Sequence, residues 1–399
     1  MKKLMILGAG IYQVPLIQKA KDMGLYTIAV SIPGPYPGFA CADEVCYLDT
    51  RDQEAVLAAA KEKKIAGICT SGTDVAVRTI GFVCNALHLP GIPAAAAITV
   101  TDKWRMKEAF AKGGVSTARF HKVTSLTEAL STARGIGYPI CLKAVDKSGS
   151  RGIRKVSDPF EMKHAWELCM AATDQNYLLV EEYLQAEEIG VDGFVQNHRL
   201  SLCVPHQKFV CRSGAVCIPS GHRFPYSCSR ELFLEIRHQI ELAVAAVGID
   251  NCPFNADLFV RNNQVWIIEI GGRSGATCIP ELMSIHCGFD YYEKMILSAL
   301  GEAPSFDYQS LTPCMAKLLF CPEGGRLTDI NPLPLEQLKH EGVQYHLDYS
   351  IGDCLPAVTN GTDRVGHVIA ATDQESEIDR ALRLLNQSLV LESESSPQA

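Results

Sequence analysis

The beginning of the chain alternates between short apolar segments and longer segments of helical character. The apolar segments LMIL, LYTIAVS and IAGIC are each followed by a helical pattern, such as VPLIQKAKDMG or QEAVLAAAKEKK. A repeat of strand and helix folds into a parallel sheet, because a crossover helix brings the next strand alongside in the same direction. The alternation therefore predicts a Rossmann-like α/β domain over residues 1–112.

The turn after the first strand resembles the start of a dinucleotide-binding domain, since it contains Gly8 and Gly10. That fingerprint also needs a third glycine for close helix packing and an acid after the second strand to bind the ribose. Gln13 and Ser31 stand at these two positions. The sequence thus argues against a nicotinamide-dependent oxidoreductase, and we interpret the two glycines as a tight turn between strand and helix.

Length and composition limit the class of protein. A chain of 399 residues exceeds one ordinary hydrophobic core, so two or three domains are expected. The formal net charge of −8 argues against a nucleic-acid partner. No segment approaches the ~20 apolar residues of a membrane helix, so no membrane partner is expected. The 16 cysteines form no CxxC pair, which favours buried thiols in a reducing cytoplasm.

A lysine-bearing helix is predicted in the segment TDKWRMKEAFAKGGVST. Either Thr101 or Asp102 can cap its N-terminus, and Gly113-Gly114 ends it. Lys103 falls on the first turn of this helix. Taken alone, Lys103 is interpreted as a solvated surface residue.

A second lysine lies within the apolar strand ICLKAV. Lys143 is costly to bury there unless its ammonium meets an anion. A Gly/Ser loop at 148–152 follows and precedes another strand, so its N–H groups and hydroxyls could contact phosphate oxygens. The alternative is a simple hairpin tip. The loop lacks the GxxxxGK[ST] pattern of a P-loop.

Two acids interrupt a predicted β-hairpin whose turn is Asn262-Asn263. With a two-residue turn, Asp257 faces residue 268, and the two acids lie on opposite faces. With a three-residue loop, Asp257 lies directly opposite Glu269 on one face. Like charges ~5 Å apart repel, and a divalent cation would convert that repulsion into a binding site. Arg273 follows in a glycine-rich turn suited to an anion.

Taken in order, these stretches resemble the ATP-grasp superfamily, and in particular its carboxylate–amine ligase branch. The resemblance rests on TDKWRMKEAFAKGGV, SGSRG, VEEYL and the paired acids followed by arginine, and it extends over nearly the whole chain. It implies an architecture like that of carbamoyl-phosphate synthetase, biotin carboxylase and the purine ligases, of mixed α/β and α+β class. The implied domains are a Rossmann-like pre-ATP-grasp domain (1–112), a mobile ATP-grasp lid (113–182), a catalytic subdomain (183–305) and a C-terminal α+β segment packed on the core (306–399).

The resemblance also implies a nucleotide-binding set. Its lysines would contact phosphates, its Gly/Ser loop would close on the β- and γ-phosphates, and its hinge strand would pair with adenine through backbone groups. Glu188 would hold the ribose hydroxyls. The set is Lys103, Lys143, Ser148, Gly149, Ser150, Arg151, Gly152, Val180, Glu181, Glu182, Tyr183, Leu184 and Glu188.

Metal and catalytic roles follow from the same resemblance. Asp257 and Glu269 would bind Mg²⁺, with Mn²⁺ as an alternative, and Arg273 and Lys143 would act on the transferred phosphoryl group. Related proteins often carry an asparagine two residues after the second acid, as a further ligand. Gly271 stands there in this chain, so water would complete the coordination or one metal site would be weaker.

The acceptor site is expected in the segment VCRSGAVCIPSGHRFPYS, which lies between the lid and the metal hairpin in sequence. His222 and Arg223 are its candidate residues for a substrate carboxylate, because binding residues tend to lie on loops. Arg273 and Gly275 are further candidates for the substrate pocket. The simpler interpretation of His222 and Arg223 is a solvated loop pair.

The implied activity is an ATP-dependent ligase in the cytoplasm that joins a carboxylate to an amine through an acyl phosphate. Its products besides the amide would be ADP and phosphate, its partners would be small molecules, and a homodimer is left open. One alternative is an ATP-grasp carboxylase that uses bicarbonate, although the chain contains no Met-Lys-Met biotin segment. A non-catalytic nucleotide-binding protein is the other, and the retained acids and lysines argue against it.

Overall fold

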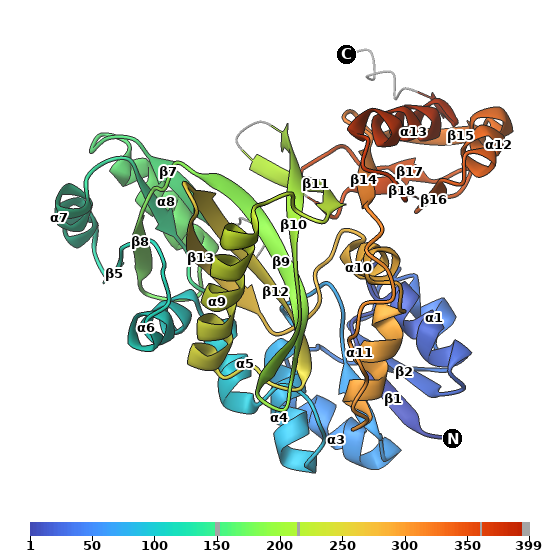
Figure 1. Cartoon of the computed structure of the whole chain (residues 1–399), viewed down its shortest axis with the longest axis horizontal. Helices are drawn as coiled ribbons and strands as arrows, with labels where there is room; N and C mark the ends of the chain where they lie inside the picture. Colours follow the sequence, from blue (N-terminus) through green and yellow to red (C-terminus); the bar gives the residue numbers. More distant parts are fainter. Residues whose placement is uncertain (148–151, 214–215, 360, 393–399) are drawn as a thin grey trace, which may run out of the picture. The chain divides into compact units, whose positions relative to one another are not determined.

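A computed structural model describes residues 1–147, 152–213, 216–359 and 361–392. Within these ranges the chain forms two compact units, and Figure 1 follows it from blue to red. The first unit comprises residues 1–205, 227–275 and 292–306, and the second comprises 206–226, 276–291 and the chain from 307 onward. The four domains predicted from the sequence stay a prediction.

The N-terminal part of the first unit is the predicted parallel sheet. Its strand order is β3-β2-β1-β4, and the β1–β2, β1–β4 and β2–β3 pairs are all parallel. Leu4, Met5, Ile6 and Leu7 of the first strand are fully buried, as a central strand covered on both faces requires. The elements are β1 (Lys3–Leu7), α1 (Val14–Asp22), β2 (Tyr26–Ser31), α2 (Gly38–Cys41), β3 (Glu44–Tyr47), α3 (Gln53–Lys63), β4 (Gly67–Cys69), α4 (Val77–Leu87) and α5 (Ala94–Val100).

The turn after β1 is filled by a side chain of the chain itself. The Gln13 carboxamide accepts a hydrogen bond from Gly10 N–H at 2.9 Å and donates one to Ser71 O at 2.5 Å. Gly8 has a φ of +98°, and a Cβ added there would lie 2.9 Å from the Gln13 side chain. In a dinucleotide-binding fingerprint the backbone of this turn is open to the pyrophosphate. In this chain the Gln13 side chain fills that space.

Helix α6 and an antiparallel sheet follow. Asp102 caps α6 by accepting hydrogen bonds from the N–H groups of Trp104 and Arg105, which settles the two capping options of the sequence. The sheet has the order β5-β8-β6-β7, and α7 and α8 pack on it around the shared core of Leu142, Val180 and their neighbours. The elements are α6 (Lys103–Gly113), β5 (Phe120–Val123), α7 (Leu126–Ile136), β6 (Ile140–Lys143), β7 (Ile153–Val156), α8 (Met162–Ala172) and β8 (Leu178–Glu182).

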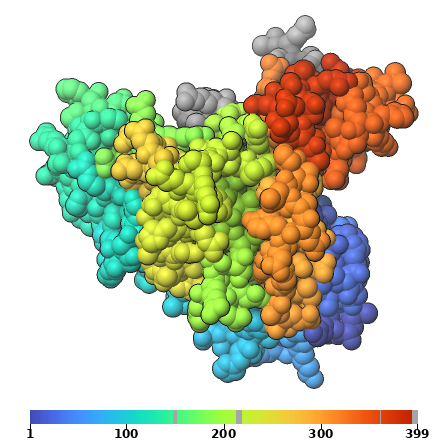
Figure 2. Space-filling model, in the orientation of Figure 1, coloured from blue at the N-terminus to red at the C-terminus, as the bar shows by residue number. Residues whose placement is uncertain are grey.

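The remaining part of the first unit is built on strands in the order β13-β12-β9-β10. Burial alternates strictly along β12 from Cys252 to Val260, so one face of this strand lies in the core and the other carries the polar residues. Helix α9 packs on β13 and α6, and Figure 2 shows its outer face in yellow-green. The elements are β9 (Glu187–Gln196), β10 (Arg199–Ser213), α9 (Arg230–Val247), β12 (Cys252–Arg261), β13 (Gln264–Gly271) and α11 (Tyr291–Ala299).

The second unit is the α+β arrangement predicted for the end of the chain. Strands β11, β14, β18 and β16 pair in that order, and β17, β15 and β19 form a separate three-stranded sheet. One hydrophobic core joins strand and helix residues such as Met315, Val368 and Leu385. The elements are β11 (Val216–Phe224), α10 (Ile279–Cys287), β14 (Cys314–Phe320), β15 (Gly325–Ile330), α12 (Pro332–His340), β16 (Gln344–Leu347), β17 (Cys354–Leu355), β18 (Arg364–Ala370), α13 (Glu375–Gln387) and β19 (Leu389–Glu392).

None of the helices in the described ranges is both long enough and apolar enough to cross a membrane. The mixed α/β and α+β class predicted from the sequence is confirmed.

Candidate functional site

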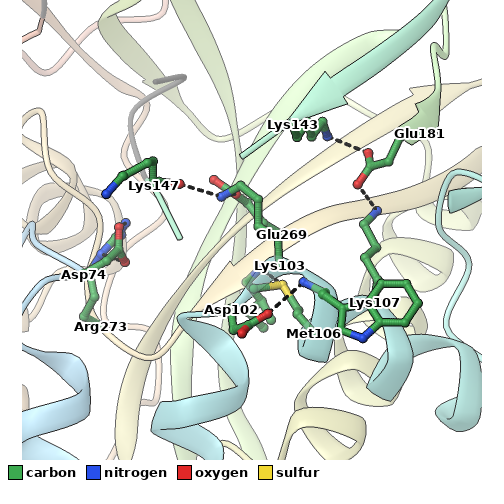
Figure 3. A network of polar contacts seen from close by, with 12 residues as sticks. Asp74, Asp102, Lys103, Met106, Lys107, Lys143, Lys147, Glu181, Glu269 and Arg273 are labelled. Carbon is green, nitrogen blue, oxygen red and sulfur yellow. Dashed lines mark hydrogen bonds and ion pairs between the residues drawn. The ribbon is translucent and has the colours of Figure 1, made fainter. Parts of the chain in front are cut away.

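Helix α6 carries Lys103 into the first unit's cluster of charged residues. The Lys103 ammonium donates hydrogen bonds to Glu269 Oε2 at 2.8 Å and to Lys147 O at 3.0 Å (Figure 3). Its side chain is only 15% exposed. Lys103 is therefore not the solvated surface lysine that its position on a first helical turn suggests, because α6 directs it at the β12–β13 hairpin.

Lys143 ends β6 and meets a carboxylate from the neighbouring strand. Its ammonium donates to Glu181 Oε2 at 2.5 Å, and both side chains are buried. Burial alone would lower the pKa of Lys143, but Glu181, with Cys141 and Glu269 acting in the same direction, raises it overall. The prediction that this buried lysine needs an anion is confirmed, and within the protein that anion is Glu181.

A third lysine, which sequence reasoning missed, completes this group. Lys107 lies one helical turn after Lys103, and its ammonium is 3.4 Å from Glu181 Oε1. Figure 3 shows the ammonium groups of Lys107 and Lys143 approaching the two oxygens of one carboxylate. Burial opposes ionisation of Glu181, but the two lysines outweigh it and hold the pKa of this carboxyl below its usual value.

The β12–β13 hairpin combines features of both registers that the sequence left open. The turn is the two-residue one, with Arg261 paired to Gln264. A bulge at Ile268 then shifts the register, so Asp257 lies opposite Glu269 after all. The expectation that a two-residue turn would put the acids on opposite faces is wrong, because a bulge inserts one unpaired residue and restores the alignment.

These two carboxylates suit a hard divalent cation by their donor chemistry. Within the described ranges, no group of three or more His, Cys, Asp or Glu side chains is arranged to hold a metal ion. Asp257 and Glu269 would hold Mg²⁺ through their carboxylate oxygens, and phosphate oxygens are ordinary further ligands of this ion. Their assignment as metal ligands stays a prediction.

Arg273 is held by a network that begins at Asp74, between β4 and α4. Its guanidinium donates to both carboxylate oxygens of Asp74, at 2.8 and 3.0 Å, and to Asn255 Oδ1 at 2.8 Å. Asn255 donates in turn to Asp192 Oδ2 at 2.8 Å, and Asp192 accepts from Gly275 N–H at 2.8 Å. Asp74, Asn255 and Asp192 were not predicted, because no local pattern distinguishes them from other polar residues.

The same network explains the glycine at position 271. A Cβ added at Gly271 would lie 3.0 Å from Asp74 Oδ1. The carboxylate that pairs with Arg273 therefore uses the space that an asparagine side chain would need. Gly271 also pairs with Asn255 across the hairpin, so the asparagine nearest this position lies on β12.

The predicted hinge begins on β8, an inner strand of its sheet. Val180 is fully buried and pairs with His121 on one side and Leu142 on the other. The backbone of Glu182 donates to Arg119 O at 2.9 Å. Tyr183 and Leu184 follow the end of β8, so they are the hinge residues whose backbone lies outside the strand. Glu188, the predicted ribose ligand, is exposed at the start of β9, whose following residues are buried.

The predicted phosphate loop is described only at its end. Ser148, Gly149, Ser150 and Arg151 lie outside the described residues. Gly152 has a φ of +69°, and its carbonyl accepts a hydrogen bond from Ala144 N–H at 2.8 Å. The described part of the loop thus closes the β6–β7 hairpin beside Lys143.

The predicted acceptor residues His222 and Arg223 belong to β11 of the second unit. The His222 imidazole is only 3% exposed, and its Nδ1 lies 3.2 Å from His206 Nδ1. Burial, with His206 and Lys208 nearby, lowers the pKa of His222 well below its usual value. A neutral, buried imidazole is poorly suited to bind a carboxylate by charge, and the substrate role of His222 and Arg223 stays a prediction.

Comparison with known proteins gives a consistent result. Residues 136–281 match the family described as the ATP-grasp domain. A formate-dependent phosphoribosylglycinamide formyltransferase from Herminiimonas arsenicoxydans is 25% identical over 323 residues, which cover 74% of this chain and 74% of that protein.

Two solved structures are similar over nearly their whole length. Phosphoribosylglycinamide synthetase from Anaerococcus prevotii is 27% identical, with a TM-score of 0.83 and coverage of 98% of this chain and 99% of that one. L-amino acid ligase from Bacillus licheniformis has a TM-score of 0.80, with the same coverage of both chains. At 18% identity the latter is a likeness of fold.

Proposed function

The chain carries an ATP-grasp domain, and from this premise we propose that it is an ATP-dependent ligase that joins a small carboxylate to an amine. The observation that carries the proposal is the placement of Asp257 opposite Glu269, with the Lys103 ammonium 2.8 Å from Glu269. Cations and carboxylates at such close range are what positioning and charge neutralisation of a transferred phosphoryl group require.

The reaction has two steps. A carboxylate oxygen of the substrate attacks the γ-phosphorus of ATP, and the bond from that phosphorus to the β,γ-bridging oxygen breaks to release ADP. The amine nitrogen of the second substrate then attacks the carbonyl carbon of the acyl phosphate. The C–O bond to phosphate breaks, phosphate leaves, and the nitrogen loses a proton to give the amide.

The lysines take the role of fixed positive charges on phosphate. In the described structure Glu269 neutralises Lys103, and Glu181 neutralises Lys143. When the nucleotide binds, Lys103 and Lys143 turn their ammonium groups to phosphate oxygens. Tyr183 and Leu184 present backbone groups to the adenine edge, because they follow β8 and are not needed for its ladder.

Asp257 and Glu269 would hold Mg²⁺, which when bound neutralises the developing charge on the phosphate oxygens. Mn²⁺ takes the same oxygen ligands and would substitute for it. Arg273 directs its guanidinium at the oxygens of the transferred group, held in orientation by Asp74 and Asn255. An enzyme that consumes ATP and carries many thiols fits the reducing cytoplasm, and we propose a homodimer as its assembly.

The test is release of ADP and phosphate from Mg-ATP in the presence of pooled small carboxylates and amines. Glu269→Ala should abolish the release, whereas the matched change Glu167→Ala, at an exposed glutamate of α8, should leave it unchanged. Release that needs one carboxylate and one amine would establish the ligase and name its substrates. Release driven by bicarbonate without an amine, or equal activity in both variants, would overturn the proposal.

A further inference from the structure

Lys107 of helix α6 is a deeply buried charged residue beside the proposed nucleotide site. Its side chain is 2% exposed, and helix geometry places it on the same face as Lys103, four residues earlier. Its ammonium donates to Thr117 Oγ1 at 2.5 Å and lies 3.4 Å from Glu181 Oε1. The Thr117 hydroxyl donates onward to Ile267 O at 2.7 Å, so the Lys107 ammonium is held in place from two directions.

The charges of this group do not cancel. Lys107, Lys143 and Glu181 form what we call the lysine–glutamate cluster, with two ammonium groups and one carboxylate. Glu181 lies between the lysines, with Lys143 on one oxygen and Lys107 facing the other. Within the cluster itself one buried positive charge is in excess, and the nearest further carboxylate that acts on both lysines, Glu269, is already paired with Lys103. Such a charge is expensive in a low-dielectric interior, and an apolar residue of similar volume would often be more stabilising.

We propose that Lys107 is a positioning residue of the nucleotide site, which fixes the Glu181 carboxylate beside Lys143 and supplies the excess positive charge that a nucleotide phosphate compensates. Lys107 does this without contacting the nucleotide. The inference rests on the proposed function, because it takes the phosphates of ATP or ADP to bind at Lys143.

The electrostatic surroundings of Lys107 support this role. The charged groups that act on it come from three strands and are Glu181 of β8, Lys143 of β6 and Glu269 of β13. Burial is the main reason that the pKa of Lys107 falls to about 8, Lys143 acts in the same direction, and Glu181 opposes them. An anion bound at Lys143 would favour the protonated form of Lys107, so nucleotide binding and protonation of Lys107 should promote each other.

The expected change in nucleotide affinity can be estimated from the interaction of the Lys107 charge with one phosphate. A unit charge ~10 Å from a phosphate, at an effective dielectric constant of ~20, changes affinity by about tenfold. The Kd of ADP with Mg²⁺, measured by calorimetry, should therefore rise about tenfold in Lys107→Met. Lys107→Arg keeps the charge and should remain within about threefold of the wild type. Lys112→Met changes an exposed lysine of the same helix and should bind as the wild type does.

The pH profile separates this role from a merely structural one. Between about pH 7 and about pH 9.5, the wild-type Kd should rise about tenfold as Lys107 loses its proton. The Lys107→Met protein should show a flat profile that meets the wild-type curve at the high-pH end, and Lys112→Met should follow the wild type throughout.

Two outcomes would overturn the inference. If wild-type protein binds ADP, but Lys107→Met binds it equally well or follows the same pH profile, Lys107 has no part in nucleotide affinity. If the wild-type protein binds neither ADP nor ATP, the proposed function fails and the inference fails with it. Unfolding of each variant, followed in parallel by tryptophan fluorescence, shows that the compared proteins are folded.

Discussion

Replacing Lys107 should alter how the stability of the protein depends on pH, and the structure allows the size and sign to be worked out. The pKa of Lys107 is about 8 in the folded protein, against ~10.4 for an unfolded lysine. Below pH 8 both states hold the proton, and the folded state carries the full penalty of a buried ammonium. Above pH 8 the folded protein releases the proton while the unfolded chain keeps it, so this contribution makes the folded state more stable as pH rises.

In that pH window, each pH unit changes the free energy of unfolding by about 1.4 kcal/mol. Between pH ~8 and pH ~9.5, Lys107 should add about 2 kcal/mol to the free energy of unfolding of the wild type. Lys107→Met lacks this increment. The difference between the two proteins therefore isolates Lys107, because ionisation of the cysteines and tyrosines affects both in the same way.

Urea unfolding followed by tryptophan fluorescence is a suitable assay. Trp104, Trp166 and Trp266 are the three tryptophans of the chain, and all belong to the unit that contains Lys107. Lys112→Met, which replaces an exposed lysine of α6, provides the control and should follow the wild-type curve. Parallel curves for wild type and Lys107→Met from pH ~7 to pH ~9.5 would refute the reasoning.

Three further changes probe the network around Arg273 and the N-terminal turn. Asp74→Asn removes the charged partner of Arg273 and should lower the urea midpoint by the equivalent of about 2 kcal/mol and reduce kcat; unchanged turnover would show that Asp74 does not orient Arg273. Gly271→Asn places a side chain against Asp74 and should lose about 1–2 kcal/mol of stability without tighter Mg²⁺ binding in an activity titration. A gain in Mg²⁺ affinity at full stability would contradict the steric reason given for this glycine. Gln13→Ala removes two hydrogen bonds of the turn after β1 and should cost about 2 kcal/mol in unfolding, and a loss below about 0.5 kcal/mol would argue against the role assigned to Gln13.

The sequence predicted those features that depend on neighbours along the chain. The parallel sheet followed from the alternation of strand and helix, and the helix at Lys103–Gly113 followed from a cap at Thr101 or Asp102 and from its terminal glycines. The hairpin at Asn262-Asn263 followed from turn chemistry. These signals are local because capping, turn geometry and side-chain periodicity act within a few residues.

The partners within the site could not be predicted in the same way. The bulge at Ile268 aligns Asp257 with Glu269, and no turn rule locates such an insertion. Lys107 looked like any helical lysine until the fold placed Glu181 beside it.

By itself, then, the sequence predicted the parallel sheet, the helix that carries Lys103, the hairpin at Asn262-Asn263, the fold class and the residue types that phosphoryl transfer requires. It took the segment of His222 and Arg223 for a loop, where the structure has β11. Only the tertiary structure decided which charges meet. Asp74 and Arg273 are 199 residues apart in the chain and yet form a bidentate pair. Such a contact depends on the packing of whole elements against one another, so no short stretch of sequence contains it.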